Sequence, residues 1–419
     1  MKKENQLSKN LLICGDNLNA LDDLIKKGIK VDLIYLDPPF FSNKHYEVVW
    51  GDEAEVRSFK DRWAGGINVY VEWMKERIAK MYDVLKDTGS FYLHCDWHAG
   101  HYLKVMLDDI FGYRNFQNEI VWDYGARATV RKSGFPRKHD ILLFYIKSIK
   151  YYFNPLYKPY KDPQMKRYNK IDSEGKRYAL IKRRRTDGTI YYGKCYPKEG
   201  APETDVWSIP LMASTSSERL GYPTQKPEAL LERIIRASSR EGDLVLDPFC
   251  GCGTAMAVAQ RLKRKWIGID ISPTAIALIE KRLGKLGAVK GEDFEVIGMP
   301  TTLSELRVLE PFEFQNWVIN EMRAKQSKKL SSDFGLDGYY DKTIFTERAG
   351  IQVKQSESVG RNVVDNFETA LSRGKFSRGF IVAFSFSKGA NEEAARVKGE
   401  GLDIRLIKVE DLLLGKVKI

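Results

Sequence analysis

Two short apolar segments that each end in Asp-Pro constrain the fold more than any other feature of this sequence. V-D-L-I-Y-L precedes D-P-P-F at residues 37–40, and L-V-L precedes D-P-F at residues 247–249. Apolar runs of this length are typical of strands in a parallel sheet, because helices cover both faces of such a sheet. Open α/β sheets bind ligands at the carboxyl ends of their strands. The sequence therefore predicts an α/β fold in which the two Asp-Pro loops meet at one site.

The chain of 419 residues divides into three regions by the texture of its sequence. Strand-like and helix-like segments alternate up to residue 124 and again over 226–286, and the sequence between them is basic and rich in aromatic residues. This pattern predicts one α/β domain over residues 1–300, interrupted by an insertion at 125–220. Alternation resumes near residue 309 and predicts a second α/β domain over 309–419, of an ordinary domain size.

Positive charge is concentrated in the insertion. Residues 127–198 contain 20 Lys and Arg against 5 Asp and Glu, a balance of 20 − 5 = +15, whereas the whole chain carries +12 and the remainder therefore 12 − 15 = −3. Such a concentration of charge is typical of a surface that faces phosphates, and it predicts a polyanionic partner. The simpler alternative is a solvated basic face.

Other features of the composition indicate a protein of the cytoplasm. The first residues, M-K-K-E-N-Q-L-S-K-N, lack the apolar run of a signal peptide, and no stretch of the sequence approaches the length of a membrane span. Five cysteines without a paired framework are typical of reduced thiols. We therefore expect a cytoplasmic location and no membrane partner.

The second Asp-Pro loop has the composition of a cofactor-binding turn. Residues 247–254 read D-P-F-C-G-C-G-T and lie between a strand-like and a helix-like segment. Gly251 and Gly253 permit close approach of the backbone, and the start of the next helix offers N–H groups to an anion. A second predicted strand ends at Asp270, where a carboxylate accepts hydrogen bonds from ribose hydroxyls. The loop lacks G-K-[ST] and is shorter than a pyrophosphate-binding loop, which favours a cofactor that carries a carboxylate.

The two loops together resemble those of the DNA amino-methyltransferases. The resemblance rests on D-P-P-F, on the glycine loop and on Y-P-T-Q-K-P at residues 222–227. Their order along the chain resembles the β class of these enzymes, over about residues 10–285. It implies a Rossmann-like methyltransferase sheet, a target-recognition role for the insertion, S-adenosylmethionine as cofactor and double-stranded DNA as partner.

The resemblance also implies a role for each matching residue. The catalytic loop that receives the target base would be Asp37, Pro38, Pro39 and Phe40. The cofactor-binding residues would be Asp16, Lys226, Pro227, Asp247, Phe249, Gly251, Gly253, Thr254 and Asp270. Within that set, Asp270 would hold the ribose hydroxyls and Asp16 would lie near the adenine of the cofactor.

An exocyclic amino nitrogen is a poor nucleophile because its lone pair is delocalised into the ring of the base. We expect the Asp37 carboxylate and the Pro38 carbonyl to accept both N–H bonds, which localises the lone pair toward the methyl group of the sulfonium. The base must leave the duplex, and Phe40 would stack on it. Adenine N6 is the predicted target because relatives that act on cytosine N4 usually carry Ser at the position of Asp37. Cytosine N4 is the nearest alternative.

The basic clusters of the insertion are the predicted DNA contacts. The residues expected to contact phosphates and base edges are Arg127, Arg131, Lys132, Arg137, Lys138, Arg183, Arg184 and Arg185. The tyrosines of the same region either pack against one another or stack on unpaired bases. The oligomeric state stays open, and a homodimer is one arrangement compatible with the sequence.

Two clusters of potential metal ligands have simpler interpretations. The run 94–98 and His101 follow a predicted strand, so that only alternate side chains would converge, and a loop beside the catalytic site is the preferred interpretation. Cys250 and Cys252 lie inside the predicted cofactor loop, where zinc would block the cofactor.

The third region resembles a nuclease. Asp333 and Asp337 precede a predicted strand on which Gln352 and Lys354 share one face. This pattern, over about residues 310–415, resembles the Mrr-like restriction endonucleases of the PD-(D/E)xK fold. The resemblance implies that Asp337 binds Mg²⁺ and that Lys354 assists phosphodiester cleavage. Either the domain cleaves DNA, in a fusion of restriction with modification, or it only binds DNA.

Overall fold

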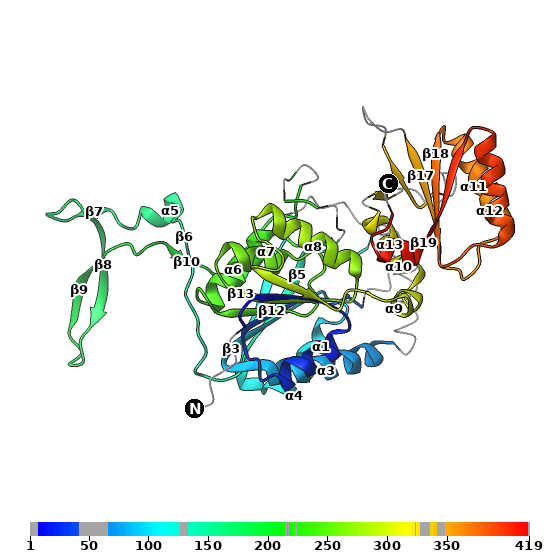
Figure 1. The fold of residues 1–419 in the computed structure, drawn as a ribbon. Helices are drawn as coiled ribbons and strands as arrows, with labels where there is room; N and C mark the ends of the chain where they lie inside the picture. Colours follow the sequence, from blue (N-terminus) through cyan, green and yellow to red (C-terminus); the bar gives the residue numbers. More distant parts are fainter. Residues whose placement is uncertain are drawn as a thin grey trace.

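A computed structural model of the chain contains two α/β domains, one on a nine-stranded sheet and one on a five-stranded sheet (Figure 1). The structure describes residues 7–41, 66–125, 133–213, 216, 218–220, 222, 224–322, 324–326, 336–341 and 348–417. Within these ranges, no helix has both the length and the apolar character that a membrane span requires.

The large sheet has the strand order β11-β4-β5-β3-β2-β12-β13-β1-β14. Its strands are β1 (Asn10–Cys14), β2 (Val31–Leu36), β3 (Leu85–Cys95), β4 (Phe116–Asp123), β5 (His139–Ile146), β11 (Val206–Ser208), β12 (Leu244–Asp247), β13 (Lys265–Asp270) and β14 (Phe294–Ile297). Neighbouring strands are parallel, except that β5 is antiparallel to β3 and β4. The predicted Rossmann-like sheet is confirmed.

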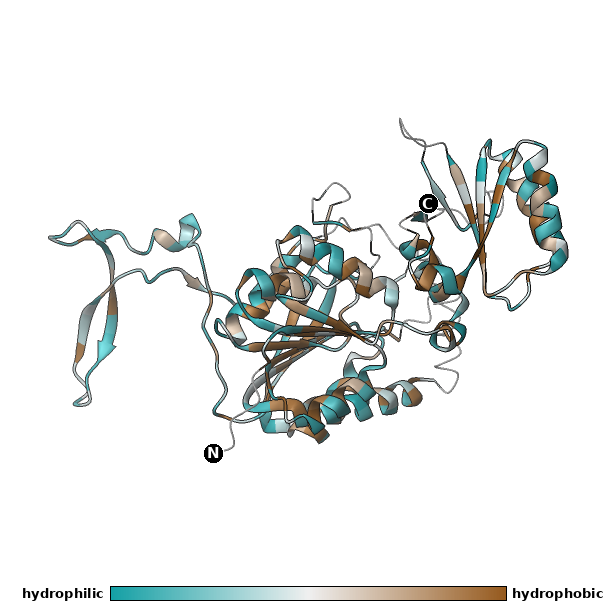
Figure 2. Ribbon diagram, in the orientation of Figure 1, coloured by the Kyte–Doolittle hydropathy of each residue, from teal (hydrophilic) through white to brown (hydrophobic). Residues whose placement is uncertain are grey.

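Helices cover both faces of this sheet, which explains why its central strands are apolar throughout. One face packs on α1 (Asn17–Lys26), α3 (Ile67–Val84) and α4 (Gly100–Phe111). The other packs on α6 (Glu228–Ser238), α7 (Thr254–Arg261) and α8 (Pro273–Lys285). All four residues of β12 are buried, and Figure 2 shows the strands of the large sheet as mainly hydrophobic and the helices as mixed.

The direction of β5 decides where the chain leaves the large sheet. Since β5 is antiparallel to β3, it starts at the carboxyl edge of the parallel strands and ends at the opposite edge. The following segment therefore departs from the opposite edge, and it returns through β11, which is parallel to β4. Residues 125–220 thus do not lie outside the sheet as one piece, because β5 and β11 are part of it.

Residues 157–202 form an arm that stands away from the large sheet (Figure 1). Its base is the antiparallel pair β6 (Tyr157–Lys158) and β10 (Ala201–Pro202). The short helix α5 (Asp162–Met165) follows β6 along the chain. Its tip is a three-stranded sheet of β7 (Lys170–Ile171), β8 (Arg177–Arg184) and β9 (Ile190–Cys195). The long β8–β9 hairpin therefore exposes both of its faces.

The C-terminal domain has a five-stranded sheet between two pairs of helices. Its strands are, in sheet order, β15 (Lys325–Gln326), β16 (Gly338–Tyr340), β17 (Ala349–Lys354), β18 (Arg378–Ala383) and β19 (Asp403–Lys408). The helices α10 (Pro311–Glu321) and α13 (Val409–Leu413) pack on one face, and α11 (Arg361–Arg373) and α12 (Lys388–Gly399) on the other. The short helix α9 (Leu303–Arg307) precedes α10, and Glu313 of α10 accepts a hydrogen bond of 3.1 Å from Ser272 of the large domain.

Candidate active site

The two Asp-Pro loops lie side by side at the carboxyl edge of the large sheet. β2 and β12 are adjacent parallel strands, with Leu33 opposite Val245. Continuing this register along both strands places Asp37 level with Phe249. The ammonium group of Lys226 contacts the Asp37 carboxylate directly, across 189 positions of sequence. The fold therefore brings together the segments that the motifs predicted to meet.

Neighbouring side chains engage both oxygens of the Asp37 carboxylate. Lys226 contacts Oδ2, and Nδ1 of His94 lies 3.5 Å from Oδ1. Lys226 also lies over the ring of Phe40, with 5.3 Å between Nζ and the ring centroid. The side chains of Asp37 and Lys226 are only 16% and 13% exposed, so this ion pair is largely shielded from solvent. Sequence reasoning placed Lys226 at the cofactor and missed its contact with the catalytic loop.

The carboxylate of Asp270 joins the glycine loop to the start of α8. Its Oδ2 accepts from the Gly251 N–H at 2.8 Å, and its Oδ1 accepts from the Ser272 N–H at 3.0 Å. Burial raises the pKa of Asp270 to about 6, although these N–H groups favour the charged form. A carboxylate with two oxygens retains acceptor capacity after two such bonds, so it still suits a pair of hydroxyl donors.

Both glycines of the loop have positive φ angles, for different packing reasons. Gly253 has φ 73°, and a Cβ at this position would lie 2.7 Å from Cγ1 of Ile279 in α8. Gly251 has φ 48°, and its Cβ would lie 3.4 Å from the ring of Tyr222. Packing of the loop on α8 therefore leaves no room for a side chain at Gly253, whereas at Gly251 the positive φ angle alone favours glycine.

Two predicted cofactor-binding side chains support the loop from within. Asp247 is 3% exposed and accepts from the Phe249 N–H at 3.1 Å. Burial raises the pKa of Asp247 well above its usual range, and the nearby Asp37 carboxylate adds to the effect. Thr254 is 6% exposed, and its hydroxyl donates to the Lys226 carbonyl at 3.4 Å. Direct contact of either side chain with a cofactor stays a prediction.

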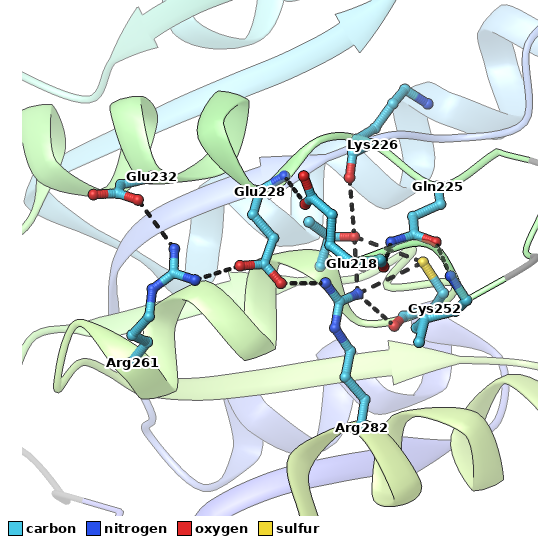
Figure 3. Close-up of polar contacts among 10 residues, drawn as sticks. Glu218, Gln225, Lys226, Glu228, Glu232, Cys252, Arg261 and Arg282 are labelled. Carbon is cyan, nitrogen blue, oxygen red and sulfur yellow. Dashed lines mark hydrogen bonds and ion pairs between the residues drawn. The ribbon is translucent and has the colours of Figure 1, made fainter. Parts of the chain in front are cut away.

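Arg282 of α8 holds the glycine loop against the start of α6, a role that no sequence motif indicated (Figure 3). Its guanidinium donates to the Cys252 carbonyl at 3.1 Å, to the Thr254 hydroxyl at 3.1 Å and to the Glu228 carboxylate at 2.7 Å. Arg261 contacts the second oxygen of Glu228. These partners lower the pKa of Glu228 although burial alone would raise it. Pro227 precedes Glu228 as the N-cap of α6.

Asp16 lies at the N-cap of α1, beside a second buried arginine. Its carboxylate accepts from the Leu18 N–H at 2.7 Å and from Arg77 at 3.0 Å. The Arg77 guanidinium lies 3.9 Å from the ring centroid of Trp73, and Trp73 in turn contacts the ring of Phe249 at 5.8 Å between centroids. Trp73 and Arg77 therefore connect Asp16 to the glycine loop, and sequence reasoning missed both.

Comparison with known proteins agrees with this geometry. Residues 31–281, more than half of the chain, match the family described as DNA methylase. The chain belongs to this family. Residues 306–414 match a second family, described as restriction endonuclease.

Three relatives are similar to this methylase over most of their own length. The Type II methyltransferase M.EcaI of Enterobacter cloacae is 32% identical over 331 residues, which cover 67% of this chain and 71% of the relative. The Type II methyltransferase M.HpaI of Haemophilus parainfluenzae is 30% identical, with 77% and 94% covered. The DNA adenine methyltransferase YhdJ of Escherichia coli is 31% identical, with 65% and 82% covered.

The basic residues of the methylase lie at two opposite edges of the large sheet. Arg137 and Lys138 directly precede β5 and lie at the carboxyl edge, where the Arg137 guanidinium is 3.8 Å from the ring centroid of Trp97. Arg183, Arg184 and Arg185 lie on the arm, which leaves from the opposite edge. The predicted contacts at Arg127, Arg131 and Lys132 fall outside the described residues.

In the C-terminal domain of the methylase, the fold gathers the predicted nuclease residues. Gly338 of β16 lies opposite Ile351 of β17, so the antiparallel register places Asp337 opposite Gln352. The Asp337 carboxylate accepts from the Val353 N–H at 2.6 Å. Gln352 and Lys354 alternate with the buried Ile351 and Val353, and they therefore share the other face of β17. The predicted residue Asp333 falls outside the described residues.

The potential metal ligands near the catalytic loop are engaged in separate contacts. His94 faces Asp37 and Asp140, whereas Nδ1 of His98 lies 2.5 Å from Asp96. Burial raises the pKa of the Cys250 and Cys252 thiols, which disfavours the thiolates that zinc requires. Over the described part of the chain, the only acidic, His or Cys cluster of metal-binding spacing is Asp365, Glu368 and Glu393. Arginines already neutralise Glu393.

Proposed function

We propose that this methylase transfers a methyl group from S-adenosylmethionine to adenine N6 in double-stranded DNA. The observation that carries the proposal is that D-P-P-F and the glycine loop follow adjacent parallel strands and are joined through Lys226, which contacts Asp37 with its ammonium group and Thr254 with its carbonyl. One loop has the groups for an amino-bearing base and the other has the groups for the cofactor. Family membership over residues 31–281 supports the same activity.

The residues around the glycine loop suit the parts of S-adenosylmethionine. The Asp270 carboxylate suits its ribose hydroxyls, and the aromatic pair Phe249 and Trp73 suits its flat and apolar parts. The start of α7 suits the carboxylate of its methionine part, since the first N–H groups of a helix attract anions. When bound, the cofactor supplies the methyl group as a sulfonium electrophile.

At the catalytic loop, the Asp37 carboxylate and the Pro38 carbonyl accept the two N–H bonds of the target amine, and Phe40 stacks on the base. Lys226 holds Oδ2 of the Asp37 carboxylate, so that little reorganisation of the carboxylate is needed when the base arrives. Positioning and electrostatics therefore carry the reaction without a covalent protein intermediate.

Analysis of the methylated nucleosides tests this function. Unmethylated plasmid DNA is incubated with the protein and methyl-labelled S-adenosylmethionine, digested to nucleosides and analysed by mass spectrometry. We expect labelled N6-methyladenine, in agreement with the Asp of D-P-P-F and with the name of the YhdJ relative. If labelled N4-methylcytosine were found instead, the target base would be cytosine and not adenine. Label in neither base, with cofactor bound, would contradict the proposal.

We propose that one face of the arm binds DNA, and the three adjacent arginines do not all lie on that face. The register of β8 and β9 places Lys182, Arg184 and Lys194 on one face, together with Lys170 of β7. Leu180, Ile190 and Tyr192 lie on the same face and are 42%, 51% and 65% exposed. Arg183 lies on the other face, where its side chain crosses Gly193. We assign the first face, with its four cations, to the phosphates and groove of the duplex.

A second candidate activity is Mg²⁺-dependent cleavage of DNA by the C-terminal domain. Asp337, Gln352 and Lys354 converge on neighbouring strands, which is the observation that favours it. The Asp337 carboxylate and the Gln352 carbonyl are oxygen ligands of the kind that Mg²⁺ prefers, and the Lys354 ammonium suits the charge that develops in phosphodiester cleavage. The match of residues 306–414 to the restriction endonuclease family supports this activity.

A further inference from the structure

A buried histidine lies directly behind the catalytic carboxylate. His94 of β3 is 0% exposed. The rings of Phe40 and Trp122 meet it edge-on, each with 5.5 Å between centroids. Its Nδ1 lies 3.5 Å from Oδ1 of Asp37 and 3.2 Å from the Tyr35 hydroxyl. An imidazole in this position is reached from solvent only through its polar neighbours.

The other nitrogen of His94 faces a second carboxylate. Nε2 lies 3.2 Å from Oδ2 of Asp140 at the start of β5, and the Tyr124 hydroxyl donates to Oδ1 of Asp140. Burial by itself would raise the pKa of Asp140, but His94, Tyr124 and the charge of Lys226 together lower it below the usual value. Asp140 is therefore ionised at neutral pH and accepts at both oxygens.

The protons of this cluster can be assigned from its donors. Burial raises the pKa of Tyr35 well above its usual range, and the nearby Asp37 carboxylate adds to the effect, so the Tyr35 phenol keeps its proton. Since the ionised Asp140 can only accept from Nε2, the free lone pair of a neutral imidazole is on Nδ1, and the Tyr35 phenol donates to it. Nε2 of His94 then carries the ring proton and donates it to Asp140. Oδ1 of Asp37 and Nδ1 of His94 are thus two acceptors, in agreement with a separation longer than a hydrogen bond.

We propose that His94, held by Asp140, receives the proton that the target amine loses during methylation. The inference rests on the proposed function. As the N–C bond forms and the S–C bond of the sulfonium breaks, a neutral thioether would leave and the positive charge would pass to the amine nitrogen, whose N–H bond then breaks as the proton moves to Oδ1 of Asp37. Oδ1 is now a donor that faces the acceptor Nδ1, so the proton passes to His94. The Tyr35 hydroxyl keeps its own proton and turns away from Nδ1 in this step, and Asp140 balances the imidazolium. After the methylated base leaves, the proton returns to solvent through Asp37, which is then charged for the next base.

His94 is in this scheme a positioning residue, since it acts on the amine only through Asp37. The charged and titratable groups that face it are Asp37 and Tyr35 from β2, Asp140 from β5, and, one contact further, Tyr124 and Lys226. A purely structural role would hold the same side chains in place without taking up a proton. The two roles therefore predict different dependences of the rate on pH.

The test is the single-turnover rate of methyl transfer between pH 5.5 and 9, at saturating cofactor concentration. The wild-type rate falls at low pH, because a protonated imidazole cannot accept a further proton. His94→Gln keeps the hydrogen-bonding shape but has no titratable group. We expect it to be about 100-fold slower at pH 8, the lower end of what general acid–base catalysis contributes, and to lose the decrease in rate at low pH.

A matched control lies on the same segment. His98 pairs with Asp96 rather than with Asp37, so His98→Gln should keep the wild-type shape of the pH profile. Asp140→Asn removes the counter-charge of the imidazolium. The rate of methyl transfer should therefore be lower in this variant, and the decrease in rate at low pH should begin at a lower pH. Calorimetry with the cofactor shows that each variant is folded.

The outcomes separate this inference from the function on which it rests. If His94→Gln binds the cofactor and keeps the wild-type pH profile, His94 takes up no proton and the inference is wrong. If His94→Gln does not fold, Asp140→Asn decides: a shifted fall supports the relay and an unchanged one contradicts it. A wild-type protein that binds the cofactor but methylates no base would instead overturn the proposed function.

Discussion

The catalytic loop and the nuclease-like site each centre on one aspartate, and they differ in how the protein surrounds it. Asp37 is held by Lys226 and lies beside His94, and the chain segments of these residues lie far apart in sequence. Asp337 is held by the Val353 N–H and lies opposite Gln352 on the adjacent strand. The first site is therefore assembled by the whole sheet with its own counter-charges. The second is a local site, formed by two neighbouring strands.

This contrast predicts how each site should respond to amino-acid substitution. A carboxylate shielded from solvent and paired with a buried ammonium group leaves that group uncompensated when its charge is removed. In the proposed nuclease activity, the Asp337 carboxylate shares a face with Gln352 and Lys354 and would act by binding a metal ion. Substitutions should therefore separate the two activities, and the largest effect should come from the catalytic loop.

Asp37→Asn should reduce methyl transfer by about 10³-fold, because a neutral amide is a weaker acceptor for the N–H of the target amine than the carboxylate and cannot take up its proton. Nicking of DNA by the C-terminal domain should be unaffected. The measurement is the initial rate of label transfer to DNA, with a thermal shift on cofactor addition to show that the variant is folded. A rate within threefold of wild type would show that Asp37 is not the acceptor.

Lys354→Ala should reduce Mg²⁺-dependent nicking of plasmid DNA by about 100-fold, since the ammonium no longer stabilises the charge of the cleaved phosphodiester. Methyl transfer should stay within about twofold of wild type, because distant sites act independently. Lys388→Ala, at a side chain that is 91% exposed on α12, is the control. Equal nicking by wild type and Lys354→Ala, or none by either, would remove the nuclease activity from the proposal.

Cofactor affinity should weaken by about tenfold between pH 7 and pH 5, because only the ionised Asp270 accepts from both ribose hydroxyls. Burial raises the pKa of Asp270 to about 6, so the carboxylate is charged above this pH and protonated below it. Titration calorimetry across this range measures the effect. Asp270→Asn should bind weakly at every pH, and a steep pH dependence in that variant would place the titrating group elsewhere.

Arg184→Glu should weaken DNA binding about fivefold, because it reverses a charge on the basic face of the arm, beside the β8–β9 turn. Arg183→Glu makes the same charge change on the opposite face and should weaken binding less than twofold. Since the arm belongs to the methylase domain, Arg184→Glu should raise the KM for methylation more than that for nicking. Fluorescence anisotropy at fixed salt measures the affinities, and equal losses in the two variants would contradict the assignment of one face to DNA.

Several elements were predictable because their signals are local. The apolar runs of β2, β12 and β13 indicated buried parallel strands, and alternation along β17 placed Gln352 and Lys354 on one face. The insertion was harder to predict. Its strand β5 is antiparallel, and no local pattern indicates the direction in which a strand enters a sheet. The basic residues were therefore expected together, whereas the fold divides them between two edges.

The sequence by itself determined the two loops, their residue types and the family to which they belong, because a strand, a glycine turn and a helix start are set by neighbours along the chain. Only the tertiary structure decided that Lys226 contacts Asp37, that His94 and Asp140 stand behind it, and that Arg282 clamps the glycine loop. Such contacts join residues that are distant in sequence, and their geometry depends on strand order and register, which emerge only when the whole sheet is packed.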